Sequence, residues 1–206
     1  LVYFGLKFDF LMIALPMFFI AFPFYLSRKW HHRKWSGIFL ALSLLFISIY
    51  FLKQFLPSFE NETIQNIILD LKNFGILTQV SFIIIGALLT VFVHFSSATI
   101  TIALLLTQKG LPIELAAMLI LGANIGTTIT AHLVAAIGNK QTKVVAAFHT
   151  LFNVLSALIF LFLGSYLIHF IQQFTPNQSV TLITFDFLTN LIVLLIVLPF
   201  ITKITQ

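Results

Sequence analysis

The sequence contains no cysteine and very little charge. Charged residues make up 8% of the 206 positions, whereas a soluble domain carries about 25%. The absence of cysteine excludes disulfides, thiolate catalysis and cysteine-based metal sites. No RNA- or DNA-binding pattern is present, so the excess of 11 Lys+Arg over 6 Asp+Glu is interpreted by its position beside apolar segments. An ordinary soluble domain and a nucleic-acid-binding protein are both excluded.

The sequence is rich in long apolar segments, and 60% of its residues are hydrophobic. About 20 consecutive apolar residues cross the hydrocarbon core of a bilayer as a helix. Four segments reach that length: 8–26, 37–56, 144–171 and 181–202. The sequence therefore predicts an all-α membrane protein, a polytopic helical bundle embedded in the lipid bilayer.

Residues 74–138 are apolar but repeatedly interrupted. The interruptions are Ser96-Ser97, the turn at 109–112 and the Gly-rich string 122–128. The unbroken pieces after Ser97 are too short to cross a core of about 30 Å. Backbone that is not helical at membrane depth persists only where protein or a water-filled cavity surrounds it. We therefore expect the functional site in this region.

The interruptions predict a re-entrant helical hairpin over 78–107, followed by a discontinuous transmembrane helix over 113–138. An alternative explains the glycines differently. Gly122 and Gly126 form a small-xxx-small pair, which allows close packing of an unbroken helix against a neighbour. Residue types alone do not choose between these interpretations.

Basic residues predict the orientation. Loop 27–36 contains Arg28, Lys29, Arg33 and Lys34, and loop 138–143 contains Lys140 and Lys143. Positively charged loops stay on the cytoplasmic side, so both loops are expected there, with loop 57–73 outside. We expect two parts: residues 1–73, two spans around the basic loop, and residues 74–206, which hold the hairpin, the broken helix and the last two spans.

Neutral oxygens crowd the interrupted region. A broken helix exposes N–H groups that attract anions and C=O groups that attract alkali cations. Hydroxyl and amide side chains can donate hydrogen bonds to an anion, and their oxygens can coordinate an alkali cation. The candidate ligands are Thr90, His94, Ser96, Ser97, Thr99, Asn124, Thr127 and Thr128, with Na⁺ expected at Ser97, Asn124, Thr127 and main-chain carbonyls. His149 and Asn153 are expected to support them.

Three strings resemble the type II sodium/phosphate cotransporter family. They are TVFVHFSSAT at 90–99, LGANIGTTITA at 121–131 and HTLFN at 149–153. The resemblance implies Na⁺-dependent symport of inorganic phosphate by alternating access, in the plasma membrane, with Na⁺ as coupling ion and no other cofactor. The family has two inverted repeats, so this chain is expected to be the linker and second repeat, completed by a missing first repeat or a second protomer.

One departure affects substrate and coupling. The family has Gln-Ser-Ser-Ser where this sequence has His94-Phe95-Ser96-Ser97. A neutral His94 would mimic the amide, whereas a protonated one would attract the anion or couple protons. The departure also leaves open a non-transporting scaffold or sensor, or a symporter of another oxyanion. An intramembrane hydrolase is disfavoured because no Gly-x-Ser-x-Gly elbow is present, so the protein is not expected to be an enzyme.

Four further polar residues each have a structural and a functional interpretation. His149 and Asn153 lie four apart on one helical face, which favours an interhelical hydrogen bond over substrate contact. His132 is expected to pack. Asp186 is the acidic residue inside a predicted span, which is a functional signal. Its position near the start of that span also fits a cap or the outer interface.

Overall fold

The computed structural model describes residues 11–27, 30–56, 66 and 75–200. These residues form helices and connecting turns, and no strand occurs among them. Five of the helices are long and apolar enough to cross a membrane. The predicted class, an all-α membrane protein, is confirmed.

The chain divides into two compact units, Leu1–Pro57 and Ser58–Gln206. The predicted outer loop 57–73 lies outside the described residues, apart from Asn66. The expected boundary after residue 73 lies outside them as well. Each unit is therefore described by itself.

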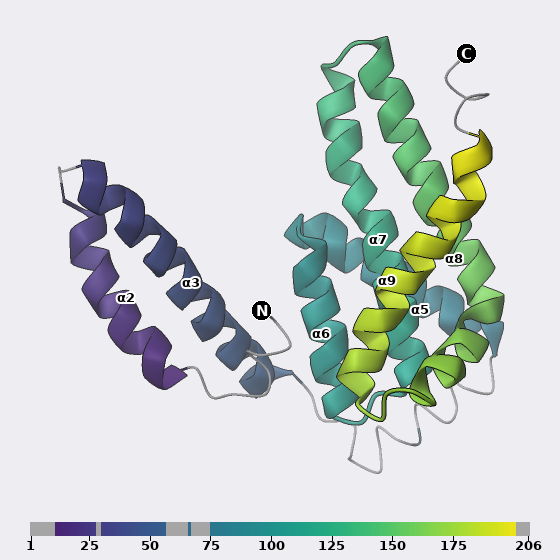
Figure 1. Cartoon of the computed structure of the whole chain (residues 1–206), viewed down its shortest axis with the longest axis horizontal. Helices are drawn as coiled ribbons and strands as arrows, with labels where there is room; N and C mark the ends of the chain where they lie inside the picture. The colour runs from purple at the N-terminus through teal and green to yellow at the C-terminus, as the bar shows by residue number, and fades with distance from the viewer. Residues whose placement is uncertain (1–10, 28–29, 57–65, 67–74, 201–206) are drawn as a thin grey trace. The chain divides into compact units, whose positions relative to one another are not determined.

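The first unit is a pair of helices, α2 (Leu11–Tyr25) and α3 (Trp30–Phe55), which pack against each other (Figure 1). With 15 residues, α2 is about 22 Å long, shorter than a bilayer core of about 30 Å. Residues 8–10 of the predicted span 8–26 lie outside the described part. The Arg33 guanidinium lies 5.7 Å from the centroid of the Tyr25 ring, so a cation–π contact ties the two helices together near their connection.

The prediction of a loop over 27–36 is wrong in its second half, because α3 already begins at Trp30. Residues 30–36 contain neither proline nor glycine, the two residues that most strongly oppose a helix. Basic residues at the end of a spanning helix lie at the membrane–water interface, and they do not interrupt the helix itself.

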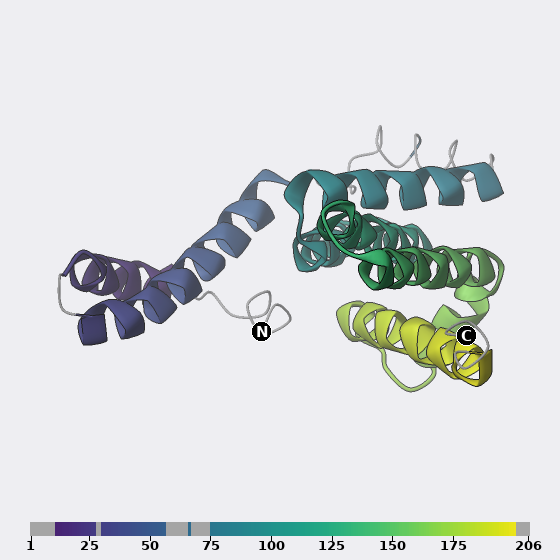
Figure 2. The ribbon, with the colours of Figure 1, turned by 90° about the horizontal axis from the view of Figure 1, so that it is seen from above.

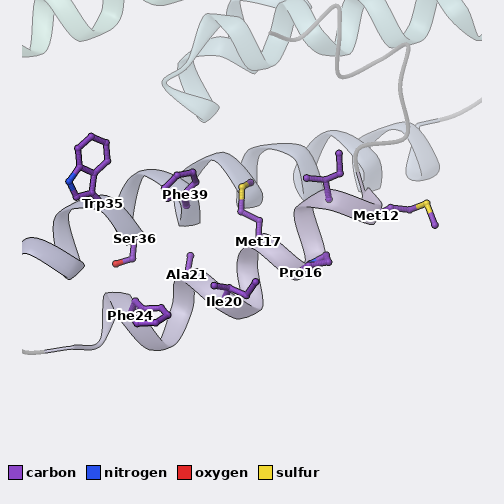
Figure 3. Close-up of a pocket in the computed structure, with 10 residues that line it drawn as sticks. Met12, Pro16, Met17, Ile20, Ala21, Phe24, Trp35, Ser36 and Phe39 are labelled. Atoms are coloured by element: carbon purple, nitrogen blue, oxygen red, sulfur yellow. The ribbon is translucent and has the colours of Figure 1, made fainter.

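An apolar cavity of about 830 Å³ lies between α2 and α3 (Figure 3). Its lining includes Met17, Phe24, Trp35 and Phe39, and Ser36 supplies its one hydroxyl. No predicted site residue lines this cavity. Its apolar walls are unsuited to holding a small ion.

The second unit contains five helices and a short 3₁₀ turn: α5 (Ile76–Val93), α6 (Ser96–Gln108), α7 (Ile113–Ala136), α8 (Lys140–Gln172), α9 (Gln178–Val197) and η1 (Leu198–Phe200). Seen from above, α5 and α9 lie on opposite sides of α7 (Figure 2). Residues 115–123 of α7 are all buried. A helix that is apolar all round belongs in a core, and α7 is the centre of this unit.

The expected interruption near Ser96-Ser97 is present. Helix α5 ends at Val93 and α6 begins at Ser96, so His94 and Phe95 separate two helices within the predicted hairpin 78–107. With 18 residues, α5 is long enough to span. Helix α6, with 13 residues, is not. Whether the pair re-enters on one side of the membrane stays a prediction.

The discontinuous helix predicted over 113–138 is wrong, because α7 runs without interruption from Ile113 to Ala136. A Cβ on Gly122 would overlap the Ile83 carbonyl oxygen, and one on Gly126 would overlap the Ala87 carbonyl oxygen. The glycines therefore let α5 lie directly against α7, as the small-xxx-small alternative requires. They bring two backbones together and do not break the helix.

The last two spans are longer at their starts than predicted. Helix α8 begins at Lys140, where Asn139 Oδ1 accepts a hydrogen bond of 3.0 Å from Thr142 N. Lys140 and Lys143 therefore lie in the first turn of α8 and not in a loop. Helix α9 begins at Gln178, behind the cap residue Asn177. Residues 201–202 of the predicted span 181–202 lie outside the described part.

Candidate functional site

The break between α5 and α6 presents two helix ends side by side in the chain. His94 closes α5 in the left-handed region (φ 56°, ψ 22°), and its N–H donates to Thr90 O at 2.7 Å. Among the described non-glycine residues, His94 alone has a positive φ. Its side chain and those of Phe95 and Ser97 are exposed, and Ser96 is half-buried.

The N-terminus of α6 has no side-chain cap. Phe95 occupies the cap position and makes no capping hydrogen bond from its side chain. The first N–H groups of a helix lack intrahelical partners and carry partial positive charge. The hydroxyls of Ser96 and Ser97 make no hydrogen bond with any described residue. Two hydroxyls and free N–H groups therefore meet at one helix end, an arrangement suited to an oxyanion.

A pair of buried threonines lies beside this break. Thr90 Oγ1 donates to Thr99 Oγ1 at 2.8 Å, and each residue is 1% exposed. A Cβ on Gly126 would come 2.8 Å from Thr90 Cβ, so α7 closes over the pair. The hydrogen bond joins α5 to α6 next to the interruption. Thr90 and Thr99 stabilise the break and do not point out of it.

Asn124 faces the opposite side of α7. Its Nδ2 donates to Asp186 Oδ1 of α9 at 2.9 Å. Two residues correspond to about 200° of helical rotation, so Asn124 points away from Gly122 and hence from α5. Asn190 Nδ2 also donates to Asp186 Oδ1, at 3.2 Å. A carboxylate and two amides form one polar cluster between α7 and α9.

The two threonines that follow Asn124 bond within α7. Thr127 Oγ1 donates to Ala123 O at 2.8 Å, and Thr128 Oγ1 donates to Ile125 O at 2.8 Å. Their hydroxyl oxygens keep lone pairs that can coordinate a cation. Because α7 is continuous through residues 122–128, no break there exposes main-chain carbonyls to Na⁺. The helix ends at the α5–α6 break are where such carbonyls occur.

The hydrogen bond expected from His149 or Asn153 to a neighbouring helix is absent among the described residues. Asn153 Nδ2 donates to His149 O of its own helix at 3.0 Å, because a carbonyl four residues back lies within reach of the amide. The bond between α7 and α8 is instead made by His132 Nε2 and Thr150 Oγ1, 2.7 Å apart. This agrees with the packing role expected for His132.

The predicted site residues therefore form two groups on opposite faces of α7. Residues 90–99 lie on the α5–α6 side, and Asn124 lies on the α9 side. No hydrogen bond joins the two groups in the described part of the chain.

Asp186 belongs to the second group, although sequence reasoning did not place it among the site residues. It does not cap α9, because that role belongs to Asn177, whose Oδ1 accepts from Ser179 N at 3.0 Å. Besides its acidic side chain inside a predicted span, a spacing signal existed. Asp186 and Asn190 repeat the four-residue spacing of His149 and Asn153, and in both pairs the Asn amide donates to the backbone carbonyl of the earlier residue.

Five helices long and apolar enough to span, four of them in the unit built around α7, define a multi-pass integral membrane protein. The chain belongs to the Na⁺/Pi-cotransporter family, whose model matches residues 57–200. The match includes every predicted site residue.

A relative from Bacillus subtilis (strain 168), described as the uncharacterized protein YqeW, is 33% identical over 120 residues. The matched segment covers 58% of this chain and 39% of the relative. This chain therefore matches well under half of the relative's length. No solved structure gives a significant match.

Proposed function

We propose that this protein carries out Na⁺-dependent symport of inorganic phosphate by alternating access, in the plasma membrane. One observation carries the proposal beyond family membership. In a member of the Na⁺/Pi-cotransporter family, the uncapped start of α6 places the free hydroxyls of Ser96 and Ser97 at a helix N-terminus.

Phosphate fits this helix end because its oxygens accept from both N–H and O–H donors. No Lys or Arg lies within residues 90–99. A fixed cation at this depth would be costly and would hold a dianion too tightly for release. Co-bound Na⁺ ions supply the neutralising charge and leave with the substrate.

Na⁺ is assigned to two places: Ser97 with main-chain carbonyls at the end of α5, and Asn124 with Thr127 on α7. Alkali cations bind hydroxyl, amide and carbonyl oxygens, and the C-terminal end of a helix favours them. His94 and Thr128 complete the proposed site, and the buried Thr90–Thr99 pair holds its two helices together. His149 and Asn153 are proposed to support it from α8 through packing, since the hydrogen bond of Asn153 lies within α8.

The proposed site is half of a larger one. Inverted repeats build transporter sites at their interface, and the proposal pairs this repeat with a first repeat or with a second protomer. Residues 27–36 and 138–143 are cytoplasmic in this proposal, following their basic residues.

Three single substitutions test the proposal: Ser96→Ala, Ser97→Ala and Asn124→Ala. Each is expected to abolish Na⁺-dependent phosphate accumulation in proteoliposomes while leaving the yield of folded protein unchanged. Ser81→Ala is the matched control, because Ser81 is exposed on α5 and its hydroxyl bonds only to Leu77 O. Uptake that tolerates all three changes as well as it tolerates Ser81→Ala would refute the proposed site.

His94-Phe95 in place of Gln-Ser is the observation that favours a second candidate, a non-transporting scaffold or sensor. Isothermal titration with phosphate at several Na⁺ concentrations separates the two. A symporter releases heat that grows with Na⁺, whereas a scaffold gives no Na⁺-dependent heat. Titration with sulfate in parallel tests the alternative of another oxyanion.

A further inference from the structure

Asp186 sits at a fixed rotational position in α9. Its neighbour Phe185 is fully buried and packs edge-on against Phe160, with ring centroids 6.1 Å apart. A Cβ on Gly164 of α8 would lie 3.7 Å from the Phe185 ring, so the ring fills the space that this glycine leaves. Packing of Phe185 thus directs the next side chain, Asp186, toward α7.

The two oxygens of the Asp186 carboxylate differ. Oδ1 accepts from Asn124 Nδ2 at 2.9 Å and from Asn190 Nδ2 at 3.2 Å. Oδ2 accepts no hydrogen bond from any described residue. It is not sealed in the core either, because Ser156 Oγ is the one fully buried side-chain polar atom without a partner in the described part. Oδ2 is therefore an open ligand position.

Asn124 offers a second oxygen in the same polar cluster. Its Nδ2 is committed to Asp186, so its amide orientation is fixed and its Oδ1 remains free among the described residues. The pair thus presents a carboxylate oxygen and an amide oxygen from two different helices. Both are hard ligands of the kind that alkali cations take.

The charge of Asp186 has no cationic partner among the described residues, since its hydrogen bonds come from neutral amides. A charged side chain inside a spanning helix is costly without a partner. A bound cation would neutralise it. One carboxylate with neutral oxygens suits a monovalent ion, whereas Ca²⁺ takes six to eight oxygens and Mg²⁺ demands near-ideal octahedral geometry.

We propose that Asp186 Oδ2 and Asn124 Oδ1 bind a Na⁺ ion between α7 and α9, which makes Asp186 a coupling residue of the transporter. The proposal rests on the proposed Na⁺-dependent function and adds a ligand from outside the motif strings. The bound ion would pull α9 and α7 together, so its arrival and departure would change the packing of the helix that also backs the α5–α6 break.

The experiment compares Asp186→Asn, Asp186→Glu and the control Glu114→Gln, which removes an acidic side chain from the first turn of α7. The initial rate of phosphate uptake is measured against Na⁺ concentration. Asp186→Asn should raise the half-saturating Na⁺ concentration about tenfold or more, the effect of losing a charged contact. Asp186→Glu should restore Na⁺ dependence in part, and Glu114→Gln should leave it unchanged. A Na⁺ curve unaltered by Asp186→Asn overturns the proposal.

A second measurement does not depend on transport. Na⁺ that binds the folded protein raises its unfolding temperature, so the Na⁺-induced rise in detergent, without phosphate, is compared between the protein and Asp186→Asn. The rise should be present in the protein and absent in the variant. Equal rises in both, or none in the protein, overturn the Na⁺ site. A protein that shows the Na⁺ rise but moves no phosphate refutes the symport and leaves the site standing.

Discussion

The break between α5 and α6 offers backbone and hydroxyl groups and no Lys, Arg, Asp or Glu within residues 90–99. His94 adopts a left-handed conformation that costs an L-residue about 1–2 kcal/mol. The buried bond from Thr90 to Thr99 holds the adjoining helices together. The geometry of the candidate site therefore depends on the backbone conformation at His94 and on the packing of α5 against α6, as well as on the side chains.

The Thr90–Thr99 pair gives a residue-scale prediction. Thr99→Val leaves the Thr90 hydroxyl buried without its acceptor, and Thr90→Val removes the donor. Each should lower the free energy of unfolding by about 0.5–1.5 kcal/mol. The double variant should cost little more than either single one, because no hydroxyl is then left unpaired. Thermal unfolding in detergent measures all three. Strictly additive losses would mean that the two hydroxyls do not interact.

Sequence could identify the polar residues of the candidate site but not their hydrogen-bond partners. Ser96, Ser97 and Asn124 stand out as polar groups in an apolar region. The partner of Asn124 lies 62 residues away, and its direction depends on how Phe185 packs. No local pattern reports the rotation of one helix about its axis, so Asp186 could be noticed as unusual but not assigned to Asn124.

At the element scale, hydropathy located the helices because membrane-spanning segments must be apolar and long. It could not decide what Gly122 and Gly126 do, since glycine serves both a helix break and a close helix contact. The contact with α5 decided it. The break lies at His94-Phe95, where a residue in the left-handed region ends α5, and α7 stays whole.

The close contact of α5 and α7 predicts an unequal response to two alanine substitutions. Gly122→Ala places a Cβ on the Ile83 carbonyl, which is backbone and cannot move aside, so a loss of about 1–3 kcal/mol or more is expected. Gly164→Ala is the control, because its Cβ comes closest to the flexible end of Met118 at 3.1 Å and lies at ordinary contact distance, 3.7 Å, from the Phe185 ring. Unfolding temperature and monodispersity in detergent report the difference. Equal tolerance would show that α5 and α7 are not in backbone contact.

At the scale of the whole molecule, the lack of cysteine makes orientation directly measurable. Single cysteines at Lys109 and Phe174 should be labelled by a membrane-impermeant maleimide from outside the cell. A cysteine at Gln141 should be labelled only after the membrane is opened. This pattern follows if α5 and α6 return to one side while α7 and α8 each cross. Labelling of Lys109→Cys and Gln141→Cys from the same side would contradict the crossing of α7.

The central claim is that phosphate movement is driven by Na⁺, and flux measured under an imposed gradient tests it most directly. The purified protein is reconstituted into liposomes with equal phosphate on both sides, and Na⁺ is then added outside, with K⁺ as the control. The account predicts that phosphate accumulates inside above its external concentration with Na⁺ and not with K⁺. Accumulation that is equal with both ions, or absent with Na⁺, would contradict it.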